Sequence, residues 1–310
     1  MLHTIIGGTG TIGKLVVEEL LHQKQLVRSV ARRKQEVPYE SMQADALNQE
    51  EIDKAIEGSS YVYLCIMLPY NAKTWSRDWP IAMKNVIEAC LKHDAVLVFL
   101  DNIYMYGPKL EVPMTEEHSL SPVSKKGESR HHIANMVQDG IVKKGLKAVI
   151  GRAADFYGPN ANQSVLYISF LENMLQGKAP QSVAYPEVKH TYAHTRDVAR
   201  GLVELALHPD THSQVWHLPV GKAVTMEEVT QKFNENLGTD FKISFIPPFL
   251  RGILALFIPV LKEVNEMQYQ FKDTYVLSDE KFRQRFPEFR VSSYEEGIPE
   301  MIQSFRQSES

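Results

Sequence analysis

Short apolar runs alternate with amphipathic stretches through the first half of the chain. The runs typical of strands are LHTIIGG, LVRSVAR, YVYLCIML, AVLVFL and LKAVIG. Helix-like stretches lie between them: KLVVEELLHQ, EEIDKAIEG, IAMKNVIEACLKH and a segment within residues 122–144. This alternation predicts right-handed βαβ units, and the continuously apolar strands predict a parallel sheet with helices on both faces.

The second half of the chain is less regular. Helix and strand signals interleave after about residue 156, and one clear helix start is Thr225 with Glu228 three residues later, a capping box opening MEEVTQKFNENL. The most apolar stretch, residues 249–261, contains an arginine and a proline and is shorter than the roughly 20 residues of a membrane span. We interpret it as a core or pocket helix, with a dimer or membrane surface as the alternative.

Composition indicates a globular protein that binds a small molecule. The chain has 310 residues, a net charge of -4 and no block of like charge, which argues against nucleic acid or an anionic membrane as partner. Its two cysteines, Cys65 and Cys90, lie in apolar stretches without metal-ligand spacing, so we expect reduced thiols and a cytoplasmic location. No signal peptide is expected, because a strand-like run begins at once.

A glycine-rich turn separates the first strand from the first helix. IIGGTGTIGKLVVEEL places Gly7, Gly10 and Gly13 so that the chain turns tightly, approaches a pyrophosphate and starts a helix whose amides face the anion. The motif also fits GxGxxG when it is counted from Gly8. We predict dinucleotide binding here by Gly7, Gly10, Thr11, Ile12 and Gly13.

The end of the second strand predicts the cofactor type. SVARR offers Arg32 and Arg33 without a competing carboxylate, which favours the 2'-phosphate of NADP, although NAD stays open. The alternative is that both arginines are solvated surface residues. Asp45 and Ala46 follow the expected third strand, where the aspartate can accept a hydrogen bond from adenine or be an exposed loop residue.

Several later segments resemble the extended short-chain dehydrogenases/reductases, the NAD(P)-dependent epimerase/dehydratase family. The segments that carry the resemblance are KNVIEAC, LVFLDNIYMYG, VPMTEEHSLSP, GRAADFYGPN and HTYAHTRDVARGL. The resemblance implies a Rossmann domain of residues 1–155 with parts of about 186–215. A smaller α/β substrate domain would contain residues 156–185 and 216–310, and two helices would form a homodimer.

The same resemblance exposes a departure at the catalytic positions. In the family a Ser or Thr and a Tyr-x-x-x-Lys pair exchange a proton with the substrate. Here Asn102 stands at the Ser/Thr position, Val123 at the tyrosine position and Gly127 at the lysine position. Lys125 and Lys126 lie close by, but they point in other directions around a helix. The standard acid/base pair is therefore absent.

Other side chains at strand ends are candidates for the chemistry. Asn102, Tyr104 and Tyr106 follow the predicted fifth strand, where open α/β sheets bind their ligands. An asparagine with two tyrosines can orient a carbonyl and supply a proton, although Tyr106 also fits a packing role. Asp155 follows the next strand, and the resemblance implies that it contacts nicotinamide or substrate.

Two more groups of residues fit binding or structural roles. Arg130 would share a helix face with Val123 and can bind a phosphate or carboxylate, or be a solvated charge. His190, His194 and Asp197 fit a pocket-wall segment of the family better than a metal site, because no further ligands converge in sequence. We predict no metal.

These features leave two functions open. One is an NAD(P)-dependent oxidoreductase or epimerase/dehydratase-like enzyme with a non-standard acid/base set, acting on a carbonyl or sugar-nucleotide type small molecule. The other is a catalytically inactive NADP-binding sensor or regulatory protein.

Overall fold

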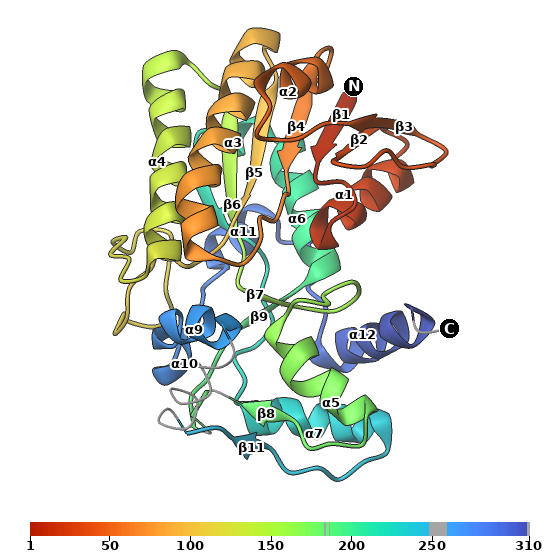
Figure 1. Cartoon of the computed structure of the whole chain (residues 1–310), viewed down its shortest axis with the longest axis vertical. Helices are drawn as coiled ribbons and strands as arrows, with labels where there is room; N and C mark the ends of the chain where they lie inside the picture. Colours follow the sequence, from red (N-terminus) through yellow and green to blue (C-terminus); the bar gives the residue numbers. More distant parts are fainter. Residues whose placement is uncertain (183, 186, 248–258, 309–310) are drawn as a thin grey trace.

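A seven-stranded parallel sheet forms the centre of the molecule (Figure 1), in the order β10–β6–β5–β4–β1–β2–β3. The computed structural model describes residues 1–182, 184–185, 187–247 and 259–308. The strands are β1 (Leu2–Ile6), β2 (Leu26–Ala31), β3 (Glu40–Gln43), β4 (Tyr61–Leu64), β5 (Val96–Asp101), β6 (Ala148–Arg152) and β10 (Val215–His217). The predicted Rossmann-type α/β sheet is confirmed.

Helices cover both faces of this sheet. One face carries α1 (Thr11–His22) and α6 (Thr195–Leu207), and the other carries α2 (Gln49–Ile56), α3 (Ala72–His93) and α4 (Lys125–Lys144). Neighbouring strand residues alternate between the two cores: Ile5 packs on the α1 and α6 side, and Ile6 packs on the other. Burial on both faces explains why the strands read as continuous apolar runs.

Local signals account for two helix starts. The side chain of Asn71 accepts a hydrogen bond from Thr74 N, so α3 begins at Ala72, well before the expected Ile81. The predicted capping box is confirmed, because Thr225 and Glu228 exchange both hydrogen bonds at the start of α7 (Met226–Leu237).

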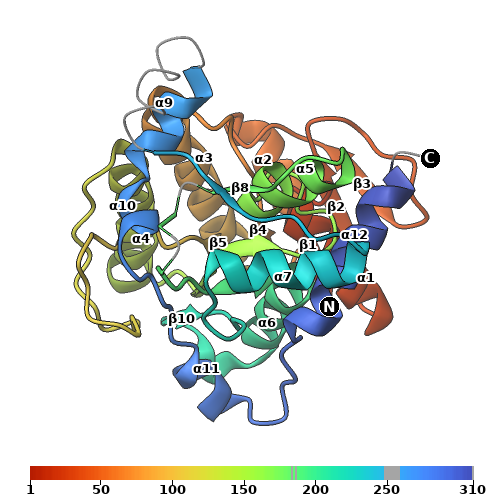
Figure 2. The ribbon, with the colours of Figure 1, turned by 90° about the horizontal axis from the view of Figure 1, so that it is seen from below.

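The rest of the chain packs below the sheet around a third apolar core (Figures 1 and 2). Its short strands are β7 (Asp155–Tyr157), β8 (Gln181–Ser182), β9 (Tyr192–His194) and β11 (Ser244–Phe245). Its helical segments are η1 (Leu166–Leu171), α5 (Glu172–Leu175), α9 (Pro259–Glu266), α10 (Tyr269–Lys272) and α12 (Tyr294–Ser308), while η2 (Pro209–Thr211) and α11 (Glu280–Arg285) lie near β10. The expected domain boundaries stay a prediction.

The carboxyl ends of the parallel strands all meet at one edge of the sheet, which faces this lower part (Figure 1). Most of the apolar stretch 249–261 lies outside the described residues. Within the described part of the chain, no helix has the length and apolar character needed to cross a membrane.

Candidate functional site at the carboxyl edge of the sheet

The glycine loop leaves no room for side chains. Gly7 adopts a φ of +91°, and a Cβ on it would lie 2.8 Å from the backbone of Cys65. A Cβ on Gly13 would lie 2.1 Å from the carbonyl oxygen of Gly7. Glycine is therefore required at both positions, and β1, the turn and α1 are packed as closely as a dinucleotide-binding turn needs.

The start of α1 is open to an anion. Its N-cap is Gly10, no side chain caps the first turn, and the first turn carries no acidic residue. The amides of Thr11, Ile12 and Gly13 therefore add a positive field without an internal counter-charge. The Thr11 hydroxyl donates to the carbonyl of Asn160 at 3.0 Å, which ties this turn to the segment after β7. These residues fit a dinucleotide pyrophosphate.

The end of β2 presents two cations. Arg32 and Arg33 follow Ala31 directly and are exposed, and among the described residues neither forms a salt bridge. Asp45 accepts a hydrogen bond from Leu47 N at 2.9 Å, and the carbonyl of Ala46 accepts one from Asn85. Asp45 and Ala46 therefore shape the neighbouring turn, and contact of the two arginines with a 2'-phosphate stays a prediction.

Asn102 organises the turn after β5. Its backbone N–H donates to Asp101 at 2.9 Å, and its side-chain oxygen accepts from Tyr104 N at 3.1 Å. The amide oxygen is thus engaged in holding the turn. The side-chain NH2 group of Asn102 can therefore donate a hydrogen bond to a ligand.

Tyr104 joins a second tyrosine at the strand ends. Its hydroxyl lies close to that of Tyr70, and its ring stacks on Trp75 with centroids 6.0 Å apart. Burial raises the pKa of Tyr104 well above 10 and that of Tyr70 to about 12, and the nearby Asp155 adds to both shifts. Both phenols therefore stay protonated at neutral pH.

Tyr106 lies apart from this pair. It is fully buried, its hydroxyl accepts from Arg152 at 3.0 Å, and it lies 2.6 Å from His217 Nε2. Burial lowers the pKa of His217 to about 3, so this ring is neutral. With its hydroxyl engaged in the core, Tyr106 has the geometry of the packing role that the sequence left open.

Val123 and Gly127, which the resemblance aligns with the family's catalytic pair, lie at the start of α4. Val123 precedes the N-cap of α4 and is 60% exposed. Gly127 lies in the first turn, where an added Cβ would come within 2.4 Å of the carbonyl oxygen of Tyr104. The turn after β5 occupies the space that a larger residue at position 127 would need, so glycine is required there.

The nearby cations are engaged with carboxylates. Lys126 is fully buried and contacts Glu263 at 2.5 Å and Glu266 at 2.6 Å, with its ammonium 4.7 Å from the ring of Tyr70. Arg130 is buried against Asp101 at 2.7 Å. Because two carboxylates offset the charge of Lys126, its position does not reproduce a lysine that lowers the pKa of a tyrosine.

Asp155 completes this edge of the sheet. One carboxylate oxygen lies 3.0 Å from His190 Nε2, and the charge raises the pKa of Tyr104, Tyr269 and Tyr275 behind the main effect of burial. Asp155 therefore lies among the tyrosines at the strand ends. The described residues contain no cluster of three or more potential metal ligands.

Sequence reasoning missed Tyr70 and Tyr269. Tyr70 follows β4 and Tyr269 opens α10, from which its hydroxyl donates to the carbonyl of Tyr104 at 2.8 Å. The sequence could have identified Tyr70 as a candidate, because it follows a predicted strand whose carboxyl end lies at the same edge of the sheet as Tyr104. No local pattern marks Tyr269, whose contact spans 165 residues.

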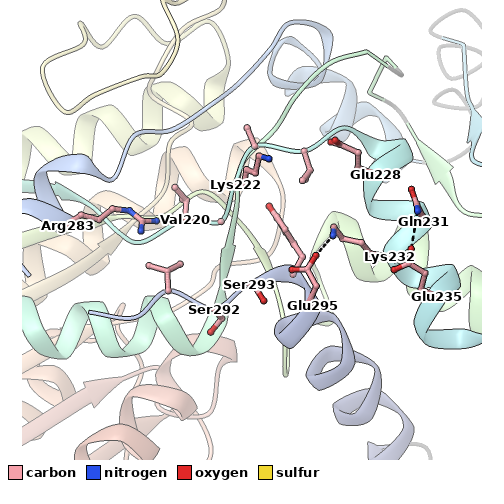
Figure 3. A pocket seen from close by; sticks show the side chains of 15 residues that line it. Val220, Lys222, Glu228, Gln231, Lys232, Glu235, Arg283, Ser292, Ser293 and Glu295 are labelled. Carbon is pink, nitrogen blue, oxygen red and sulfur yellow. Dashed lines mark hydrogen bonds and ion pairs between the residues drawn. The ribbon is translucent and has the colours of Figure 1, made fainter. Parts of the chain in front are cut away.

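A separate cavity of about 580 Å³ opens between α7, the start of α12 and the loop after β10 (Figure 3). Its lining carries both charge signs, including an ion pair of Lys232 with Glu295. None of the tyrosines described above lines it. We therefore place the candidate site at the strand ends, where the glycine loop and the polar side chains converge.

The fold resembles solved sugar-nucleotide enzymes over almost the whole chain. UDP-glucose 4-epimerase from Thermotoga maritima, solved with UDP-glucose, is 20% identical with a TM-score of 0.81, covering 100% of both chains. A dTDP-glucose 4,6-dehydratase double mutant from Streptomyces venezuelae, solved with NAD, is 17% identical with a TM-score of 0.80, covering 99% of this chain and 97% of that one. At these identities the likeness shows the fold.

Sequence comparison gives the family. An uncharacterised protein of Methanocaldococcus jannaschii is 21% identical over 192 residues, and the match covers 61% of this chain and 59% of the length of that curated relative. The NAD dependent epimerase/dehydratase family matches residues 3–221, which include the glycine loop, the turn after β5 and the start of α4. The chain belongs to the NAD dependent epimerase/dehydratase family.

Proposed function

We propose that this protein is an NAD(P)-dependent enzyme that reduces a carbonyl group of a small molecule, with Tyr104 as its proton donor. The observation that carries the proposal is the hydroxyl pair of Tyr104 and Tyr70 at the strand ends. It lies at the same edge of the sheet as a glycine loop that fits a dinucleotide. Asn102 would orient the carbonyl through its amide NH2 group.

The protonation state of Tyr104 gives the direction of the reaction. Burial keeps Tyr104 in its protonated form at neutral pH, so it is available as a proton donor and not as a base. Bound NADPH supplies the hydride. Tyr104 then gives its proton to the carbonyl oxygen, which leaves an alcohol, and Tyr70, which is partly exposed, returns a proton from solvent.

The proposed cofactor is supported by residues of this chain, and the proposed substrate class is supported by proteins of similar fold. The two arginines after β2, which form no salt bridge with any described residue, favour NADP, whereas the dehydratase of similar fold was solved with NAD. The epimerase solved with UDP-glucose supports a sugar nucleotide or a related carbonyl compound. A cytoplasmic location and a homodimer stay predictions.

The test combines binding with turnover. Purified protein is titrated with NADPH and then assayed for NADPH oxidation with a panel of sugar nucleotides and carbonyl compounds. Tyr104→Phe should lower turnover at least about a hundredfold and leave NADPH affinity within about twofold. Tyr61→Phe, at the opposite edge of the sheet, is the matched control. Full turnover in Tyr104→Phe would overturn the role of Tyr104.

A second function is favoured by the start of α4. Val123 is exposed, Gly127 is enclosed by the backbone of Tyr104, and two carboxylates surround Lys126. A nucleotide sensor without catalysis would show this loss of the acid/base pair. It would bind NADPH selectively, oxidise it with no member of the panel, and change its affinity for a macromolecular partner when the nucleotide binds.

A further inference from the structure

A short helix of the lower part lies against two helices of the sheet layer. Figures 1 and 2 both show α9 and α10 beside the ends of α3 and α4 that lie at the carboxyl edge of the sheet. In α9, Glu263 accepts from the backbone N–H of Ala72, the first residue of α3, at 3.0 Å. Glu266 accepts from the N–H of Lys125, the first residue of α4. Two carboxylates three residues apart thus dock on two helix N-termini.

A buried cation joins the two carboxylates. Lys126 contacts Glu263 and Glu266 at 2.5 and 2.6 Å, and its ammonium also donates to the carbonyl of Glu263 at 3.2 Å. The side chain of Lys126 is fully buried, whereas those of Glu263 and Glu266 are 18% and 21% exposed. The single charge of Lys126 offsets only one of the two carboxylates. The positive N-terminal ends of the α3 and α4 dipoles stabilise the remaining negative charge.

The segment that follows covers the proposed proton donor. Tyr269, the first residue of α10, donates its hydroxyl to the carbonyl of Tyr104 at 2.8 Å and lies close to the Ser124 side chain. Phe271 stacks on His190, the partner of Asp155. The α9–α10 segment, residues 259–272, therefore forms one wall of the strand-end site.

Residues 263–266 of α9 are all only partly buried. Two of them, Glu263 and Glu266, attach the helix to α3 and α4 through ion pairs and hydrogen bonds. A contact of this kind can open without exposing the apolar cores of the sheet, whereas Phe271 is buried in the third core and anchors the α10 end of the segment. If α9 moved away, Lys126 would lose both carboxylate partners and keep an uncompensated buried charge. The two ion pairs of Lys126 therefore favour the closed position of α9.

We propose that the α9–α10 segment is a gate over the strand-end site and that Lys126 is the latch that holds it closed. The gate would admit and enclose the small molecule. This proposal does not depend on catalysis, because a sensor and an enzyme both need access to the site. It also gives Lys126 a task other than that of the family's catalytic lysine.

Hydrogen exchange followed by mass spectrometry tests the latch in the full-length protein without a ligand. In Lys126→Met, which keeps the aliphatic stem and removes the charge, amides of residues 259–272 should exchange about tenfold faster or more than in wild type. The rest of the chain should exchange at its wild-type rate. Lys143→Met on the same helix removes an exposed ion pair with Asp139 and should change nothing in 259–272.

A second variant covers the case in which Lys126→Met does not fold. Glu263→Gln with Glu266→Gln keeps the lysine and removes both carboxylates, and the same amides should exchange faster. Unchanged exchange of residues 259–272 in a folded variant would overturn the proposal. Faster exchange spread evenly over sheet and helices would overturn it too, because Lys126 would then support the whole fold.

Discussion

The glycine loop and the start of α4 lie at the same edge of one sheet, but they differ in how far they keep the family pattern. Around the loop, contacts of 2.1 Å and 2.8 Å to an added Cβ make Gly13 and Gly7 obligatory. At the start of α4, the close contact involves Gly127 and the carbonyl of Tyr104, at the position that the resemblance aligns with the family's lysine. Close backbone packing requires glycine in both regions, at the predicted nucleotide loop in one and at the position predicted to replace the catalytic lysine in the other.

The largest effect should come from the loop. Gly13→Ala brings a Cβ against the carbonyl of Gly7, so β1 and α1 must separate and the pyrophosphate amides lose their alignment. We expect NADPH affinity to fall about a hundredfold, corresponding to about 3 kcal/mol of strain. Fluorescence titration measures this loss. Wild-type affinity in a folded Gly13→Ala protein would contradict the assigned nucleotide site.

Gly127→Ala should disturb the start of α4 and the turn after β5 without affecting the glycine loop. Its Cβ would lie 2.4 Å from the carbonyl of Tyr104, which costs about 1 to 3 kcal/mol in the free energy of unfolding and displaces the turn after β5. Urea denaturation measures the cost, and NADPH affinity should change little.

Gly140→Ala is the matched control on the same helix. Its nearest contact is the flexible end of Leu146 at 3.0 Å, and alanine favours a helix over glycine by about 1 kcal/mol. We expect Gly140→Ala to be much less destabilising than Gly127→Ala. Equal losses in the two variants would remove the argument that position 127 is closed by Tyr104.

A smaller effect is expected at the end of β2. Replacing Arg32 and Arg33 together by alanine removes the two cations that fit a 2'-phosphate, so NADPH affinity should fall about tenfold. NADH affinity serves as the internal control and should stay the same, because NADH lacks that phosphate. An equal loss for both nucleotides would assign the arginines to general support of the loop.

The smallest expected effect is an absence of change with pH. Burial raises the pKa of Tyr104 well above 10, so the proton-donating form persists as the pH rises. The rate of carbonyl reduction at saturating NADPH should therefore stay flat between about pH 7 and 9. A titration near pH 7 to 8 that removes activity would point to another proton donor.

The alternating pattern predicted the sheet and its helices because those elements are local in sequence. Strand-length apolar runs and the capping box at Thr225 need only a few neighbouring residues. The glycine loop could be predicted for the same reason, because its motif lies within residues 7–13. The start of α3 was missed because Asn71 caps it ahead of the apolar pattern that begins at Ile81.

The strand-end chemistry was less predictable because it depends on distant contacts. Lys126 and its two carboxylates are 137 and 140 residues apart, and no local spacing joins them. The sequence predicted that Tyr104 lies at the carboxyl edge of the sheet, but it did not reveal that the hydroxyl of Tyr104 lies close to that of Tyr70. It also could not show that a backbone carbonyl fills the space beside Gly127, because that is a property of packing.

The most direct test of the central claim is a titration of wild type and Tyr104→Phe with NADPH, each followed by the turnover panel. The account predicts tight NADPH binding by both proteins and NADPH oxidation by the wild type alone. Absence of NADPH binding by the wild type would contradict the preserved nucleotide site, and undiminished oxidation by Tyr104→Phe would contradict the rebuilt proton site.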